Sequence, residues 1–126
     1  MPPVQVVFYQ EGHKVPVQDW ISRLSGDQQD ACYDRLERLR DHGHELGFPV
    51  AEHLGDGIWE LRTRVGKVRL RMLYFFHGRE AVVIAQGFHK DTGKVPPAEI
   101  NRAKERRAGY EDAPDLHTLH WERDNG

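Results

Sequence analysis

The sequence predicts a single α+β domain: a small twisted antiparallel sheet, an N-terminal helical hairpin packed on one face, and a C-terminal helix, in the order β-α-α-β-β-β-α. Three observations support this fold class. The chain has 126 residues, of which 38% are hydrophobic, which suits one domain with a modest core. Two segments with apolar residues at helical spacing precede two segments in which apolar and polar residues alternate and a third that is apolar on both faces. A further segment of helical character follows these three.

The N-terminal part contains one predicted strand and two predicted helices. Residues 4–9 are rich in β-branched and aromatic side chains, which is typical of a strand. Pro16 is suited to the first turn of a helix that runs to about Leu24. A second helix is expected over residues 28–42, and the Gly- and Pro-containing residues 43–57 are expected to form a loop.

Three strands are predicted in the centre of the chain. Residues 58–65 and 68–76 alternate, and Gly66-Lys67 between them suits a two-residue hairpin turn. Residues 81–88 are apolar on both faces, which indicates a central strand. A basic loop is expected over residues 89–96.

Pro97 is expected to begin the last helix, which ends near Tyr110. The domain is therefore predicted to span residues 1–110. Residues 111–126 form an acidic tail, expected to be mobile or to dock as a short helix. With the helices on one face, the other face of the sheet is expected to be free, and Leu73 and Phe75 on it are interpreted as an apolar shelf for a base or a partner.

The net charge of −2 averages two unlike regions. Residues 62–107 contain twelve Lys and Arg against four Asp and Glu, whereas the rest of the chain contains six against sixteen. A basic block that is also rich in strand residues indicates a surface for a polyanion such as nucleic acid, built on a sheet. A solvated charged surface is the alternative.

Four arginines are predicted to converge on one face of the hairpin, because Arg62 and Arg64 share a face of one strand and Arg69 and Arg71 share a face of the next. Like charges placed opposite each other destabilise a sheet, so a phosphate is the expected ligand, held by the two-pronged guanidinium. The alternative is that Arg64 and Arg69 extend into solvent or pair with Glu60.

The strand end next to this patch carries His89 and Lys90, either of which is suited to acid–base chemistry. No metal site and no cofactor are expected, because the single Cys32 excludes a multi-cysteine zinc site and no nucleotide-binding or zinc-protease motif is present. No membrane span and no signal peptide are expected, so a cytoplasmic location is predicted.

The run IWELRTRVGKVRLRMLYFFHGREAVVIAQGFHKDTGKVPPAEINRAKER, together with the upstream VQDWISRLSGDQQDACYDRLERLRDHGHELGFP, resembles the HigB-like, phage-associated branch of the RelE/ParE toxin superfamily. The resemblance covers residues 4–110. It implies a RelE-like fold and the toxin of a type II toxin–antitoxin system, with an antitoxin of helix-turn-helix type as partner. It also implies a ribosome-dependent mRNA endonuclease, in which the ribose 2′-OH attacks the adjacent phosphate, so that ribosome and mRNA are further partners.

The resemblance assigns roles to particular residues. Arg62, Arg64 and Arg71 are expected to bind and stabilise the phosphate, and His89 or Lys90 is expected to move protons. Further basic side chains are expected to contact RNA, namely Lys67, Arg69, Lys94, Arg102 and Arg106. The acidic tail is atypical of the family, and one hypothesis is that it lies across the basic face and competes with RNA.

Two other function classes remain open from the sequence. ParE-like members of the superfamily poison DNA gyrase through protein contacts, although such a function gives no reason to gather arginines on one sheet face. The second of these hypotheses is a module of the same fold that binds RNA or a partner without catalysis.

Overall fold

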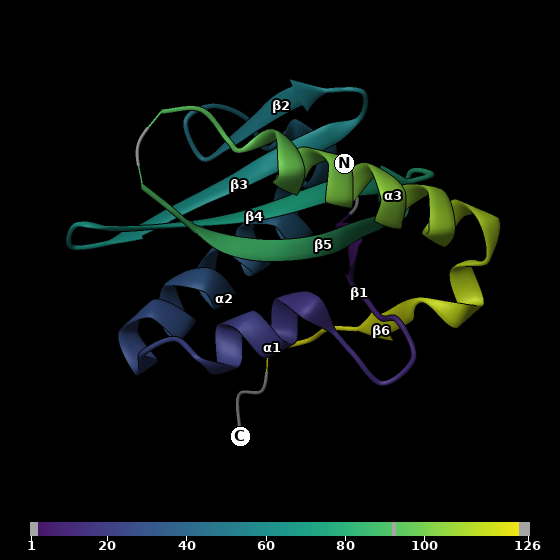
Figure 1. Cartoon of the computed structure of the whole chain (residues 1–126), viewed down its shortest axis with the longest axis horizontal. Helices are drawn as coiled ribbons and strands as arrows, with labels where there is room; N and C mark the ends of the chain where they lie inside the picture. The colour runs from purple at the N-terminus through teal and green to yellow at the C-terminus, as the bar shows by residue number, and fades with distance from the viewer. Residues whose placement is uncertain (1–2, 92, 124–126) are drawn as a thin grey trace.

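The computed structural model describes residues 3–91 and 93–123 (Figure 1). All seven elements expected from the sequence are present in the expected order, and two further short strands, β2 and β6, are added. The elements are β1 (Gln5–Tyr9), α1 (Pro16–Ser22), α2 (Gly26–His42), the 3₁₀ helix η1 (Gly43–Glu45), β2 (Ala51–Gly55), β3 (Ile58–Val65), β4 (Val68–His77), β5 (Ala81–Lys90), α3 (Pro97–Asp112), the 3₁₀ helix η2 (Pro114–Leu116) and β6 (Thr118–His120).

The α+β class is confirmed, and the sheet is mixed rather than wholly antiparallel. Its six strands lie in the order β2-β3-β4-β5-β1-β6 (Figure 1). Strand β1 runs parallel to β5, and all other neighbouring pairs are antiparallel. A parallel pair requires a long crossover between its strands, and here two helices and three strands separate β1 from β5 in the chain. Local sequence does not specify that pairing.

Strand β2 lies within residues 43–57, which were expected to be a loop. It pairs with β3 through three residues and then bulges between His53 and Gly55. The segment is short and lies between Pro49 and Gly55, so its alternation is too brief to identify it as a strand. Pairing with β3 therefore makes this segment a strand.

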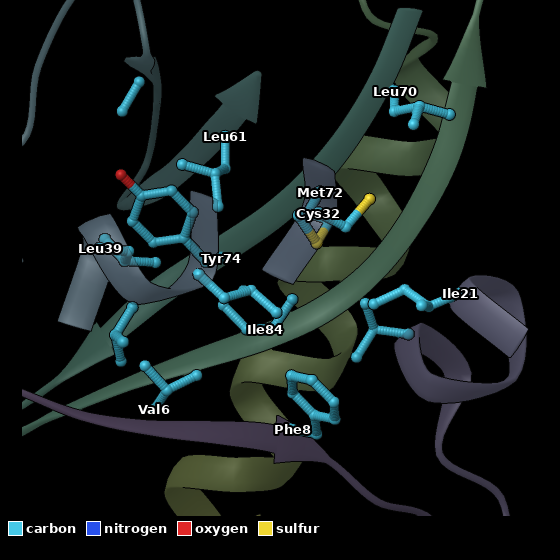
Figure 2. Close-up of a cluster of buried hydrophobic side chains, with 14 of the residues drawn as sticks. Val6, Phe8, Ile21, Cys32, Leu39, Leu61, Leu70, Met72, Tyr74 and Ile84 are labelled. Atoms are coloured by element: carbon cyan, nitrogen blue, oxygen red, sulfur yellow. The ribbon is translucent and has the colours of Figure 1, made fainter. Parts of the chain in front are cut away.

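The larger core lies between the sheet and the two N-terminal helices (Figure 2). Ile21 of α1 and Leu39 of α2 pack toward Met72, Tyr74 and Ile84 of the central strands. A capping box fixes the start of α2, where Ser25 accepts a hydrogen bond from the backbone N–H of Gln28 and its own backbone N–H donates to the Gln28 side chain. The expected helical hairpin is thus held at its turn and along its apolar side.

Cys32 lies in this core and is fully buried, as its place on an apolar helical stripe predicts. Burial raises the pKa of its thiol to about 12. The thiolate is the reactive form of cysteine, so this side chain acts as a small apolar packing group.

Helix α3 packs on the opposite face of the sheet, which was expected to be free (Figure 1). Leu73 and Phe75 are fully buried there, and the Phe75 ring meets the Tyr110 ring edge-on at 5.9 Å between centroids. The proposed apolar shelf is therefore a second core, because these large side chains are covered by α3 rather than left for a ligand. The arginine-bearing end of β3 and β4 remains outside this second core.

The tail is docked at the sheet edge opposite β2. Strand β6 pairs with β1, and Trp121 lies with its ring centroid 6.0 Å from those of both Phe8 and Tyr33. Arg123 forms ion pairs with three acidic residues of α2. Through residue 123 the tail therefore does not lie across the basic face, contrary to that hypothesis.

Replacing Trp121 with alanine should destabilise the fold by about 2–3 kcal/mol, because the half-buried indole joins β1 to α2. Urea unfolding followed by circular dichroism measures the change. Leu116→Ala is the matched control, since this side chain is 73% exposed and its loss should change stability by less than about 0.5 kcal/mol. Equal effects of the two substitutions would contradict docking of the tail.

Candidate functional site

The β3–β4 hairpin brings the predicted arginines together. Arg62 lies opposite Arg71 and Arg64 lies opposite Arg69 in the antiparallel register. The hairpin turn begins with Gly66, whose φ of 58° suits the residue without a side chain. The four guanidinium groups therefore belong to one patch on the face that α3 partly covers.

A fully buried carboxylate lies among these cations. Glu60 on β3 is 0% exposed, and its Oε1 accepts a hydrogen bond of 2.7 Å from Arg62 Nε. Its Oε2 lies 3.4 Å from Arg71 Nε and 4.0 Å from Lys90 Nζ. Three cations on three strands thus share one buried negative charge.

The hydrogen bonding of this cluster is incomplete. Glu60 Oε2 and Arg71 Nε are both buried, and neither has a hydrogen-bond partner among the described residues, although they form an ion pair. Burial lowers the pKa of Arg71; Glu60 opposes this shift, and Arg62 and Arg69 add to it. Arginine nevertheless stays protonated, so the cluster retains an excess of positive charge.

One cavity opens next to Glu60. It has a volume of about 480 Å³, and we refer to it as the carboxylate cavity. Its lining residues are Glu52, Leu54, Glu60, Arg62, Lys90, Gly93, Lys94, Val95, Pro97 and Ile100. The lining of this cavity therefore combines two carboxylates, three basic side chains and four apolar side chains.

Glu52 is a residue of this cavity that the sequence did not reveal. It lies on β2, is 44% exposed and forms an ion pair with Arg62. Glu52 lies in a segment that was expected to be a loop, and it approaches Arg62 only because β2 pairs with β3. The sequence pattern therefore gave no reason to select this residue. The fold thus adds a second carboxylate to the arginine patch, beside Glu60.

A second cavity lies on the other side of Arg62. It has a volume of about 360 Å³, and we refer to it as the arginine cleft. Its lining residues are Arg35, Pro49, Val50, Arg62, Thr63, Arg64, Arg69 and Arg71. Arg35 comes from α2, and its Nε donates to the backbone carbonyl of Arg62 at 2.8 Å.

The structure separates the two acid–base candidates. Lys90 lies with Glu60 on the arginine face, whereas His89 lies on the α1 side, where Trp20 Nε1 donates to His89 Nδ1 at 3.4 Å. A register shift in the β4–β5 pairing between Leu73 and Tyr74 leaves Ala85 as an extra residue in β5. This bulge inverts the alternation of β5 from Gln86 onward, so Lys90, and not His89, faces the arginines.

The other predicted RNA contacts are divided between sites. Lys94 lines the carboxylate cavity, Arg69 lines the arginine cleft, and Lys67 is exposed at the hairpin turn. Arg102 and Arg106 line a separate cavity of about 340 Å³ between α1 and α3. Burial lowers the pKa of Arg106, which donates to the carbonyl of Ala85 and to the side chain of Gln86.

Two further features concern the described part of the chain. Among residues 3–91 and 93–123, no group of three or more His, Cys, Asp or Glu side chains is arranged to hold a metal ion. Within the same ranges, no helix has both the length and the apolar character needed to span a membrane.

Comparison with known protein families gives a match over most of the chain. The family model for phage-derived Gp49-like proteins (DUF891) matches residues 19–108, which include every residue that lines the carboxylate cavity and the arginine cleft. No curated protein matches the chain.

Glu60→Gln should destabilise the protein by about 3 kcal/mol or more, because it leaves three cations around a buried neutral group. Urea unfolding at neutral pH measures this change. Glu52→Gln removes the exposed partner of the same arginine and should cost less than about 1 kcal/mol. Wild-type stability of Glu60→Gln would show that the cluster does not depend on the buried charge.

Proposed function

Because the chain belongs to the Gp49-like phage-derived protein family, part of the RelE/HigB-like toxin superfamily, we propose that it is a type II toxin that cleaves mRNA on the ribosome. The observation that carries this proposal is the group of Arg62, Arg71 and Lys90 held around Glu60 beside a cavity that also contains Glu52. This group supplies both phosphate-binding and proton-transferring side chains at one place.

The proposed reaction is attack of a ribose 2′-OH on the adjacent phosphorus. The O2′–P bond forms and the P–O5′ bond breaks, which yields a 2′,3′-cyclic phosphate and a 5′-OH. Negative charge grows on the non-bridging oxygens in the transition state. Arg62 and Arg71 are proposed to stabilise it, because fixed guanidinium groups bind phosphate oxygens without having to reorganise.

Two protons must move in this reaction. Glu52 is proposed to accept the proton of the 2′-OH, since its carboxylate is half-exposed at the mouth of the cavity beside Arg62. Lys90 is proposed to donate a proton to the leaving O5′, because its ammonium group lies on the same face as the arginines. His89 faces α1 and is not given a role in proton transfer.

The remaining basic residues are proposed to bind the RNA backbone. Arg69 lines the arginine cleft, Lys94 lines the carboxylate cavity and Lys67 is exposed at the hairpin turn, while Arg102 and Arg106 line the cavity between α1 and α3. Binding through such contacts weakens steeply as salt concentration rises. An antitoxin of helix-turn-helix type is the proposed cellular partner that neutralises this surface.

Lys90→Met should lower cleavage of translated mRNA by about 100-fold or more, because it removes the proposed acid. Arg71→Lys should lower cleavage by a similar factor, since a single ammonium replaces a fixed two-pronged donor. Primer extension on an mRNA translated in vitro with purified protein measures cleavage.

His89→Ala is the matched comparison to Lys90→Met, and Arg79→Gln in the exposed β4–β5 turn is the control for a lost positive charge. Both should leave cleavage close to wild type. Loss of activity in His89→Ala with normal activity in Lys90→Met would reverse the assignment. The proposal would be rejected if mRNA stays intact and translation is unimpaired in the presence of the wild-type protein. In that case, inhibition of gyrase supercoiling would indicate the ParE-like alternative.

A further inference from the structure

We propose that the arginine cleft is a nucleotide-binding subsite that holds a residue of single-stranded RNA next to the reacting phosphate, with Phe48 stacking on its base. The inference rests on the proposed function, because it names how the substrate of that site is held. It assigns binding, rather than chemistry, to Arg35, Arg64 and Arg69.

The arginines of the cleft are held in place by backbone carbonyls. Arg35 Nε donates to Arg62 O at 2.8 Å, Arg64 Nε donates to Gly66 O at 2.7 Å, and Arg69 Nη1 donates to Asp91 O at 3.4 Å. Each guanidinium has five N–H groups, so these contacts leave most donors available. The cleft is therefore arranged before any ligand arrives.

The charge of the cleft is not balanced within the protein. In the described ranges, the ion pairs of this region involve Arg62 and Arg71, and no carboxylate oxygen lies within 4.0 Å of Arg35, Arg64 or Arg69. Burial and Arg38 lower the pKa of Arg35, and Asp34 opposes this shift. Within the cleft, repulsion from Arg62 and Arg69 adds to the lowering of the pKa of Arg71 by burial. A bound phosphate relieves this repulsion through two-pronged hydrogen bonds.

An aromatic side chain stands beside the cleft. Phe48 is 76% exposed and precedes the cleft residues Pro49 and Val50. The guanidinium carbon of Arg62 lies 5.7 Å from its ring centroid, so one face of the ring is already engaged with a planar cation. Exposed aromatic rings next to basic grooves stack on nucleobases without strict sequence preference.

The cleft and the carboxylate cavity meet at Arg62, which lines both. A nucleotide stacked on Phe48 therefore lies next to the side chain proposed to bind the reacting phosphate. An acidic peptide also satisfies the arginines, but it has no base to place on Phe48. The exposed ring thus favours single-stranded RNA over an acidic segment.

The test is binding of a fluorescent single-stranded RNA of about six nucleotides to the full chain, measured by anisotropy. The RNA carries 2′-O-methyl groups throughout, so that no cleavage occurs during the titration. Phe48→Ala should weaken binding by about tenfold, whereas Phe48→Trp should retain it. Leu116→Ala, which removes the other large exposed apolar side chain of residues 3–91 and 93–123, should have no effect.

Arg64→Gln and Arg69→Gln should each weaken binding and lower the slope of log Kd against log salt concentration by about 0.7. Arg79→Gln, at the opposite end of β4, is the control and should leave the slope unchanged. Circular dichroism of each variant confirms folding.

Three results would each overturn the subsite. They are no measurable binding by the wild-type protein, unchanged binding in Phe48→Ala or in both arginine variants, and displacement of the RNA by polyglutamate equally well in wild type and Phe48→Ala. Cleavage is measured separately by primer extension. Ribosomal cleavage that depends on Lys90, together with RNA binding that ignores Phe48, rejects the subsite and leaves the proposed function intact. Binding that depends on Phe48 without any cleavage supports the subsite and rejects the proposed reaction.

Discussion

The buried carboxylate of Glu60 is the constraint on which the rest of the site depends. A charge with no solvent exposure is tolerated only when cations and hydrogen bonds compensate it, and Glu60 has Arg62, Arg71 and Lys90 within ion-pair distance. In return, the carboxylate keeps three cations from separating by mutual repulsion. Their positions are therefore set by the protein before any ligand binds, which is the condition under which fixed charges stabilise a transition state most effectively.

The bulge at Ala85 determines which side chain joins this group. In a regular strand, Ile84, Gln86 and Phe88 would share the face that packs on α1 and α2, and His89 would face the arginines. The extra residue moves Phe88 into the core under α3 and turns Lys90 toward Glu60. A change of one residue in the pairing register thus exchanges an imidazole for an ammonium group at the site.

The separation of charge along the chain becomes a separation in space. The tail lies along β1 at one edge of the sheet, and Arg123 is paired with acids of α2. The arginine cleft and the carboxylate cavity lie toward the other edge, near β2 and β3. The described tail therefore leaves the basic face open, and the carboxylates that pair with its arginines, Glu52 and Glu60, come from β2 and β3.

The sequence by itself determined the α+β class, the helical hairpin and the β3–β4 register that gathers Arg62, Arg64, Arg69 and Arg71, because apolar spacing and a two-residue turn are local properties. Tertiary structure alone decided the remaining features. Pairing with β3 turned a Gly- and Pro-flanked segment into β2 and brought Glu52 to Arg62, and packing of α3 buried Leu73 and Phe75. Which of His89 and Lys90 faces the arginines was also decided there, because a bulge depends on how β5 fits β4 and leaves no mark in the alternation of a strand that is apolar on both faces.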